Sequence, residues 1–236
     1  MQRAPESKFA VVFVHGAGGG GWEWAVWARV FAAEGHAVLA PDLQAAADGL
    51  AATCLADYSA QVGEWIASAR IAAPGRRVAL VGASLGGLLA LIHAAAADAL
   101  VLVNPIPPDG LPGPVPEGAT VPWGREASLA GTRRALPDAD DLAALYAFRR
   151  WRDESGDVVR QARAGVPGSA VAVPTRILAS ADDADVPCEG STELASKLSA
   201  SLHRLPGSHV GPLLGRHAAG AAAAAVEWLN GLHRLS

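Results

Sequence analysis

Short hydrophobic runs recur along the chain, and each is about the length of one β-strand. The first, residues 9–14 (FAVVFV), is apolar at every position and leads directly into His15-Gly16. A strand that is buried on both faces of a parallel sheet has this continuous pattern instead of alternating apolar and polar positions. Four further runs predict strands of the same kind, at residues 37–40, 78–81, 100–103 and 177–179, and residues 202–205 form a fifth, less purely apolar one.

Segments with a helical spacing of apolar positions separate most of these runs. Gly35 ends the first segment and Pro74-Gly75 ends the second, as glycine and proline commonly do at helix ends. The predicted helices are residues 22–34, 53–73, 85–97, 192–200 and 220–232. Strands that alternate with helices form βαβ units, so the pattern predicts an α/β fold with a mostly parallel central sheet flanked by helices.

One stretch of the chain breaks this alternation. Residues 105–116 are rich in proline and glycine, and residues 138–164 predict one or two amphipathic helices with no strand between them. We interpret residues 105–172 as a small helical cap inserted over the active site. The two remaining parts, residues 1–104 and 173–236, then form the core of a single domain.

Composition limits the classes of partner. With 51% hydrophobic and 18% charged residues, the chain of 236 residues has the composition of a globular protein. The net charge of −4 is spread along the sequence, which argues against a nucleic-acid or membrane partner and favours a small-molecule substrate. We expect a monomer or homodimer. No apolar signal segment opens the sequence, so we expect a cytoplasmic protein.

The two cysteines do not indicate a metal site. Cys54 and Cys188 are far apart and have no histidine or cysteine at metal-ligand spacing. Gly18–Gly21 could suggest a phosphate-binding loop, but the Lys-Ser/Thr of such a loop is missing. We therefore expect neither a metal nor a cofactor.

A G-x-S-x-G pentad, Gly82-Ala83-Ser84-Leu85-Gly86, lies between a predicted buried strand and an apolar helix. Because the chain contains 26 glycines, a G-x-S-x-G match by itself is a weak signal. The position of the pentad between a strand and a helix is what indicates a nucleophilic serine. A sharp turn from strand to helix would present Ser84 at the carboxyl end of the strand. The competing interpretation is an ordinary turn or helix-cap serine.

A serine nucleophile needs a base within hydrogen-bonding reach. His209 follows the last predicted strand, where a loop would bring it to the same edge of the sheet as Ser84. The other candidates are less favourably placed: His203 in the strand, His217 in the final helix, His233 at the tail, His93 within a helix and His36. The imidazole in turn needs a carboxylate, and Asp182, Asp183 and Asp185 all follow the strand at residues 177–179.

These motifs occur in the chain order Ser, Asp, His, and together the sequence resembles the α/β-hydrolase fold superfamily. The segment from His15 to Gly19, with Trp22 and Trp24 and then Pro41-Asp42-Leu43, is similar to the esterase and hydroxynitrile-lyase-like branch. The resemblance implies that Asp183, in the pattern Asp-x-x-Val-Pro, is the acid of a catalytic triad. It also implies an oxyanion hole built from the backbone N–H groups of Ala17 and Leu85.

The resemblance implies a serine hydrolase of the carboxylesterase type, which cleaves an ester, thioester or lactone through an acyl-enzyme. The same triad also serves C–C bond hydrolases and haloperoxidase-like enzymes, and a non-catalytic ligand-binding member is a further alternative. Dehalogenases and epoxide hydrolases would carry Asp in place of Ser84. Hydroxynitrile lyases would carry Lys after His209, where this chain has Val210.

Three features have no assigned role in the sequence. Trp22, Trp24 and Trp27 are interpreted mainly as core residues. The cap residues Tyr146, Phe148, Trp151, Arg149, Arg150 and Arg152 could grip a substrate or form a solvated helix face. The glycine-rich segment of residues 208–216 has no physical explanation from the sequence.

Overall fold

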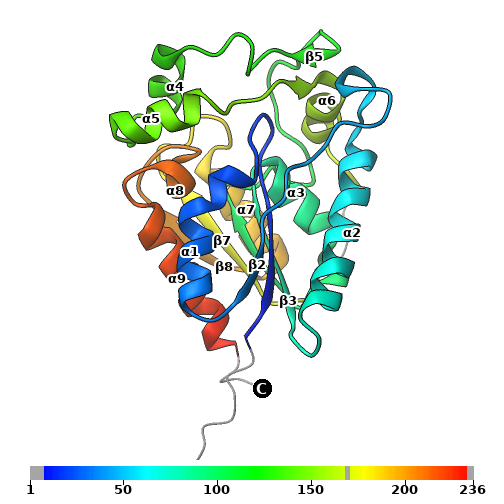
Figure 1. Ribbon diagram of the computed structural model, residues 1–236, viewed down its shortest axis with the longest axis vertical. Coiled ribbons are helices and arrows are strands. Elements are labelled where there is room, and N and C mark those ends of the chain that lie inside the picture. Colours follow the sequence, from blue (N-terminus) through cyan, green and yellow to red (C-terminus); the bar gives the residue numbers. More distant parts are fainter. Residues whose placement is uncertain (1–7, 168–170, 233–236) are drawn as a thin grey trace, which may run out of the picture.

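The computed structural model describes residues 8–167 and 171–232, with a six-stranded sheet at its centre (Figure 1). Its strands are β1 (Ala10–Val14), β2 (Ala37–Leu39), β3 (Val78–Ala83), β4 (Ala99–Val103), β7 (Thr175–Ser180) and β8 (Ser201–Leu205). Neighbouring strands are parallel throughout, in the order β2-β1-β3-β4-β7-β8. In the register of the sheet, Val12 pairs with both Leu39 and Leu80. The predicted α/β fold with a mostly parallel sheet is confirmed.

Alternate residues of β1 enter two hydrophobic clusters on opposite faces of the sheet. Val12 and Val14 belong to one cluster, and Val11 and Phe13 belong to the other. Both faces are covered by helices, which explains why the strands are apolar at successive positions. The first face carries α2 (Leu55–Ala72), α3 (Leu85–Ile92) and α7 (Cys188–Leu198), and the second carries α1 (Ala25–Ala33) and α9 (Ala218–Gly231).

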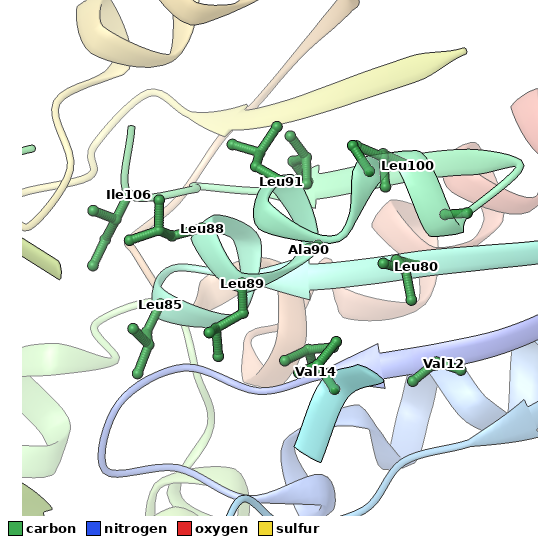
Figure 2. Close-up of a cluster of buried hydrophobic side chains, with 14 of the residues drawn as sticks. Val12, Val14, Leu80, Leu85, Leu88, Leu89, Ala90, Leu91, Leu100 and Ile106 are labelled. Carbon is green, nitrogen blue, oxygen red and sulfur yellow. The ribbon is translucent and has the colours of Figure 1, made fainter. Parts of the chain in front are cut away.

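Helix α3 is the most deeply buried of these helices and begins directly after Ser84. Figure 2 shows Leu89 of α3 toward Val14 of β1 and Leu88 toward Ile106, all within the first cluster. Burying a leucine side chain stabilises a fold by roughly 1.5–3 kcal/mol. The turn that carries Ser84 is therefore held by a strand and a helix that are both packed in the core.

Most element boundaries lie close to the predicted ones, and the largest differences occur at helix ends. The predicted helix at residues 22–34 begins as a 3₁₀ turn, η1 (Gly21–Trp24), before α1. Helix α3 ends at Ile92 and is followed by a second 3₁₀ turn, η3 (Ala94–Ala96). Helix α7 starts at Cys188, earlier than the predicted residue 192.

The chain between β4 and β7 holds five short elements, which lie across the carboxyl ends of the strands in Figure 1. They are β5 (Thr120–Val121), α4 (Leu129–Ala135), α5 (Asp141–Phe148), β6 (Glu154–Ser155) and α6 (Gly156–Ala164). The prediction of no strand within residues 138–164 was wrong, because β6 lies between α5 and α6 and pairs antiparallel with β5. A strand of two residues is too short to produce a period in the sequence.

Within the described residues, no helix combines the length and the hydropathy that a bilayer-spanning segment needs.

Candidate active site

Ser84 occupies a strained turn between β3 and α3. Its backbone has φ 53° and ψ −118°, in the half of the Ramachandran plot that non-glycine residues rarely adopt. A Cβ atom at Gly82 would overlap the carbonyl oxygen of Gly86, and one at Gly86 would overlap that of Val14. The backbone N–H of Ser84 donates to the carbonyl of Val103 on β4 at 3.0 Å. The two glycines of the pentad are thus required by close backbone contacts.

His209 and Asp183 are joined by a hydrogen bond of 2.7 Å from Nδ1 to Oδ2. The Asp183 side chain is fully buried, and that of His209 is 12% exposed. The other oxygen of Asp183, Oδ1, accepts from the backbone N–H groups of Asp185 and Val186, each at 2.8 Å. Asp182 is instead exposed and accepts from the N–H of Gly207 at 3.3 Å. Of the three candidate acids, Asp183 is the one that forms a hydrogen bond with the histidine in the described part of the chain.

The protonation of His209 is set by opposing effects. Burial lowers the pKa of His209, but the hydrogen bond and charge of Asp183, together with the charges of Asp185 and Glu23, outweigh burial and raise the pKa above its ordinary value. Because Nδ1 donates to Asp183, Nε2 is the nitrogen that can act as a base. In the described part of the chain no hydrogen bond joins Ser84 Oγ to His209, a contact that in apo enzymes is commonly long.

The remaining histidines that are described lie away from the cavity that contains Ser84. His93 contacts Ser59, His203 contacts Arg176 across the sheet, and His217 is the N-cap of α9. His36 is buried beside Phe9, and His233 lies outside the described residues. His209 is the one histidine among the described residues that lines a cavity together with Ser84.

Asn104, directly after β4, holds the histidine loop in place, and the sequence analysis missed it. Its Nδ2 donates to the carbonyl of His209 at 2.7 Å and to Ser180 Oγ at 2.9 Å, while its Oδ1 accepts from the N–H of Ser180 at 2.7 Å. Asn104 is buried and has φ 44°. An asparagine just after a buried strand is a weak signal, because Asn also favours ordinary turns.

The carboxylate of Asp138, in the loop between α4 and α5, explains the glycines around His209. It accepts from Ser208 Oγ at 2.8 Å and from the N–H of Ser208 at 3.2 Å. Cβ atoms at Gly207 and Gly211 would overlap this carboxylate. The glycine-rich segment that the sequence could not explain is therefore shaped around one half-buried acidic side chain from the inserted segment.

The His-Gly loop, which follows β1, is fixed by His15. Its Nδ1 donates to the carbonyl of Gly16 at 2.8 Å, and its Nε2 accepts from the N–H of Leu43 at 2.9 Å. Burial, and next to it the charge of Arg152, lowers the pKa of His15 to about 4, although the Gly16 contact opposes the shift. His15 is therefore neutral at physiological pH and links the loops that follow β1 and β2.

Residues just before and within β6 hold the same loop from the other side. The N–H of Arg152 donates to the carbonyl of Gly18 at 2.8 Å, and its Nε donates to that of Gly19 at 2.7 Å. The N–H of Gly18 donates to Glu154 Oε2 at 3.0 Å, and Tyr58 Oη donates to Glu154 Oε1 at 2.7 Å. Arg152 thus donates hydrogen bonds to the backbone of this loop, and the backbone groups of Gly18 and Gly19 have partners within the protein.

A cavity of about 730 Å³ opens above Ser84 and His209. Its wall is mainly apolar and includes Ile106, Leu111, Trp123 and Trp151. Ala17 and Leu85 also line it, and among the described residues neither of their backbone N–H groups has a hydrogen-bond acceptor. The volume lies within the usual range of small-molecule sites, about 300–1,000 Å³. Trp22 packs edge-to-face against Tyr146 and against Trp151 of the cavity wall.

Asp183, Asp185 and His209 present potential metal-ligand atoms within 4.8 Å of one another. Two of these groups are already hydrogen-bonded to each other through potential ligand atoms, because Asp183 Oδ2 accepts from His209 Nδ1. The third, Asp185, is exposed on the same loop. The cluster is accounted for by the histidine–aspartate pair.

Comparisons with known proteins agree with this architecture. The sequence model of the alpha/beta hydrolase family matches residues 11–224. A pyrethroid hydrolase from Sphingobium faniae JZ-2 superposes with a TM-score of 0.70 at 20% identity, over 95% of this chain and 96% of that one. A variant of tomato methylketone synthase I gives 0.73 at 18% identity, over 96% and 99%. A monoacylglycerol lipase from Paleococcus ferrophilus gives 0.71 at 19% identity, over 94% of each chain. No curated protein sequence matches significantly.

Proposed function

The chain belongs to the alpha/beta hydrolase family, and we propose that it is a serine hydrolase that cleaves a carboxylic ester of a small molecule. Ser84 is the nucleophile, His209 the base and Asp183 the acid of a catalytic triad. The observation that carries the proposal is the buried 2.7 Å hydrogen bond between Asp183 and His209, at a cavity that also exposes the strained Ser84. Structural neighbours that are named as a pyrethroid hydrolase and a monoacylglycerol lipase support an ester as the substrate class.

In the proposed reaction, Ser84 Oγ attacks the carbonyl carbon while His209 Nε2 takes the hydroxyl proton. Asp183 stabilises the resulting imidazolium and holds the ring in the required tautomer. The N–H groups of Ala17 and Leu85 donate to the oxyanion, and such a donor contributes on the order of 3 kcal/mol to the transition state. His209 then protonates the departing alkoxide, which leaves an acyl-enzyme for water to hydrolyse. No step calls for a metal or cofactor.

The cavity favours an ester with a sizeable apolar part. Trp123 and Trp151 provide flat apolar surfaces near Ser84, whereas Glu126, Arg134 and Arg163 also line the cavity and carry charge. An apolar acyl or alcohol group would gain roughly 25 cal/mol for each Å² of surface that it buries. Thioesters and lactones fit the same mechanism, because they present the same carbonyl group to Ser84.

The decisive test compares wild type with Ser84→Ala, using p-nitrophenyl acetate and butyrate as substrates. A fluorophosphonate probe, read by intact mass, reports whether the serine is activated. We expect the wild type to turn over both esters and to gain one adduct, and the variant to do neither. Equal activity in both proteins would overturn the assignment of Ser84. An inert and unlabelled wild type would favour the alternative of a ligand-binding protein.

A further inference from the structure

Glu23 is a buried acidic residue for which the proposed triad has no use. It lies in η1, after the His-Gly loop, and only 3% of its surface is exposed. Its Oε2 is buried and has no hydrogen-bond partner among the described residues. A Cβ atom at Gly19 would overlap the Glu23 carboxyl group, so this glycine makes room for it. Buried carboxyl groups are unfavourable unless a partner satisfies them, which makes the unpaired Oε2 a feature that needs a cause.

The Glu23 side chain lines a second, small cavity beside the proposed triad. This cavity has a volume of about 50 Å³, and its wall includes Gly16, Ala17, Ser84, Trp151 and His209. It is too small for an ester but large enough for a water molecule, which occupies about 30 Å³ in the liquid. A stable buried water needs two to four polar partners, and Glu23, Ser84 and His209, which all line the cavity, carry groups of this kind.

We infer that Glu23 is a positioning residue, and that it holds in this cavity the water that releases the acyl group from Ser84. The inference rests on the proposed function, because it concerns the second half of the same reaction. The water in this position lies beside both the nucleophile, which carries the acyl group, and the base. This water gives the Glu23 carboxyl group the hydrogen-bond partner that the described residues do not provide to Oε2.

The chemistry of the step balances with these groups alone. The water oxygen attacks the acyl carbonyl carbon while His209 Nε2 removes one water proton. The bond from the acyl carbon to Ser84 Oγ then breaks, and His209 returns the proton to Oγ. The products are a carboxylic acid and the regenerated serine. Glu23 stays unchanged and acts only by holding the water in an orientation from which it can attack. Misplacing a reacting group by about 1 Å can lower the rate of a reaction by about 10²-fold.

The charge state of Glu23 suits this task. Burial raises the pKa of Glu23 to about 8, although the N–H groups of Gly20 and Gly16 and the charges of His209 and Arg152 oppose the shift. At neutral pH the carboxyl group is therefore mostly protonated, and it can both donate to and accept from a water molecule.

The test measures acylation and deacylation separately in wild type, Glu23→Ala and Glu23→Gln with p-nitrophenyl butyrate. Stopped-flow absorbance gives the p-nitrophenolate burst, and acid-quenched intact mass gives the fraction of acyl-enzyme. In Glu23→Ala we expect steady-state turnover to fall about tenfold or more, with acyl-enzyme accumulating while the burst rate stays near that of wild type. Glu23→Gln, which retains hydrogen bonding, should show a smaller loss, and exposed Glu34→Gln should show none.

Added hydroxylamine provides a readout that simple structural damage would not change. This nucleophile captures the acyl group directly, so it should increase the turnover of Glu23→Ala by a larger factor than that of wild type. Acylation and deacylation that fall together, or deacylation that is unchanged in both variants, would overturn the inference. Failure of the proposed function looks different, because the wild type itself would then form no acyl-enzyme.

Discussion

Asp183 and Glu23 are both buried carboxyl groups near His209, and they differ in what surrounds them. Asp183 receives three hydrogen bonds, one from His209 Nδ1 and two from backbone N–H groups of its own loop. Glu23 has an oxygen without a partner among the described residues, next to a cavity of about 50 Å³. Nearly equal burial thus produces one carboxyl group that is held by donors and one that is left open to a small ligand.

The comparison shows that the hydrogen-bond donors around a buried carboxyl group influence its role more than its degree of burial does. Hydrogen bonds to a carboxylate favour its charged form, whereas burial alone favours the protonated form. The loop after β7 turns so that the N–H groups of Asp185 and Val186 both point at Asp183 Oδ1. At Glu23 burial is the dominant effect, so its pKa lies near 8. One acid orients an imidazole, and the other is suited to orienting a neutral molecule.

The largest expected effect comes from removing the carboxylate that faces His209. Asp183→Asn should lower kcat/KM for p-nitrophenyl butyrate by about 10³–10⁴-fold, because the amide group favours the wrong imidazole tautomer. Asp182→Asn, on the same loop but exposed, is the matched control and should retain most of the activity. Equal losses in the two variants would mean that the loop, and not the Asp183 carboxylate, is what matters.

Removal of Asn104 should weaken the support of the same loop. Asn104→Ala leaves the buried N–H of Ser180 and the carbonyl of His209 without their partner. We expect the free energy of unfolding, measured by urea denaturation, to fall by about 2–4 kcal/mol. The rate of fluorophosphonate labelling should fall as well, because His209 is less firmly placed. An unchanged unfolding midpoint would contradict this description of the loop.

Glu23 should make the fold less stable as the pH rises. The folded state keeps the Glu23 proton up to about pH 8, while an unfolded glutamate releases it near 4.5, so between these values the folded state binds more protons. Stability must then decrease with increasing pH. Relative to Glu23→Gln, the wild type should lose about 2 kcal/mol of unfolding free energy between pH 6 and pH 8. Parallel stability curves for the two proteins would show that Glu23 does not titrate in this range.

The smallest expected effect concerns Asp185, whose exposed charge raises the pKa of His209. The wild-type kcat/KM should increase with pH through a pKa above 6.5, because only the neutral imidazole can accept the serine proton. Asp185→Asn should shift this rise of kcat/KM to lower pH by roughly 0.3 units at low ionic strength. Added salt should reduce the difference. A shift toward higher pH would be inconsistent with the sign of the interaction.

The sequence predicted well those features that local patterns encode. Continuous apolar runs gave the strands, and glycines at residues 82 and 86 marked the turn around Ser84, which the structure shows to be required by backbone contacts. The candidate residues Asp183 and His209 each follow a strand, and parallel strands end at one edge of the sheet. Their meeting follows from topology, and their catalytic roles stay predictions.

Features that depend on contacts between distant segments were not predictable. Asp138 contacts Ser208, which lies 70 positions further along, and Glu154 contacts Gly18 across 136 positions. No periodicity links such pairs, so the reason for the glycines at residues 207 and 211 emerged only in the structure. Glu23 sits between two tryptophans in a segment predicted as an amphipathic helix, where an acidic residue suggests a solvated position.

The hydrogen bonds that join Arg152 and Glu154 to Gly18 and Gly19 bear on how this protein could be re-engineered. Exchange of the inserted segment is an obvious way to alter which substrates enter an enzyme of this architecture. A graft that lacked the Arg152 and Glu154 side chains would remove two hydrogen bonds from the loop that carries Ala17. The segment is therefore not a free-standing module, and a functional chimera would need to bring along or rebuild these two side chains.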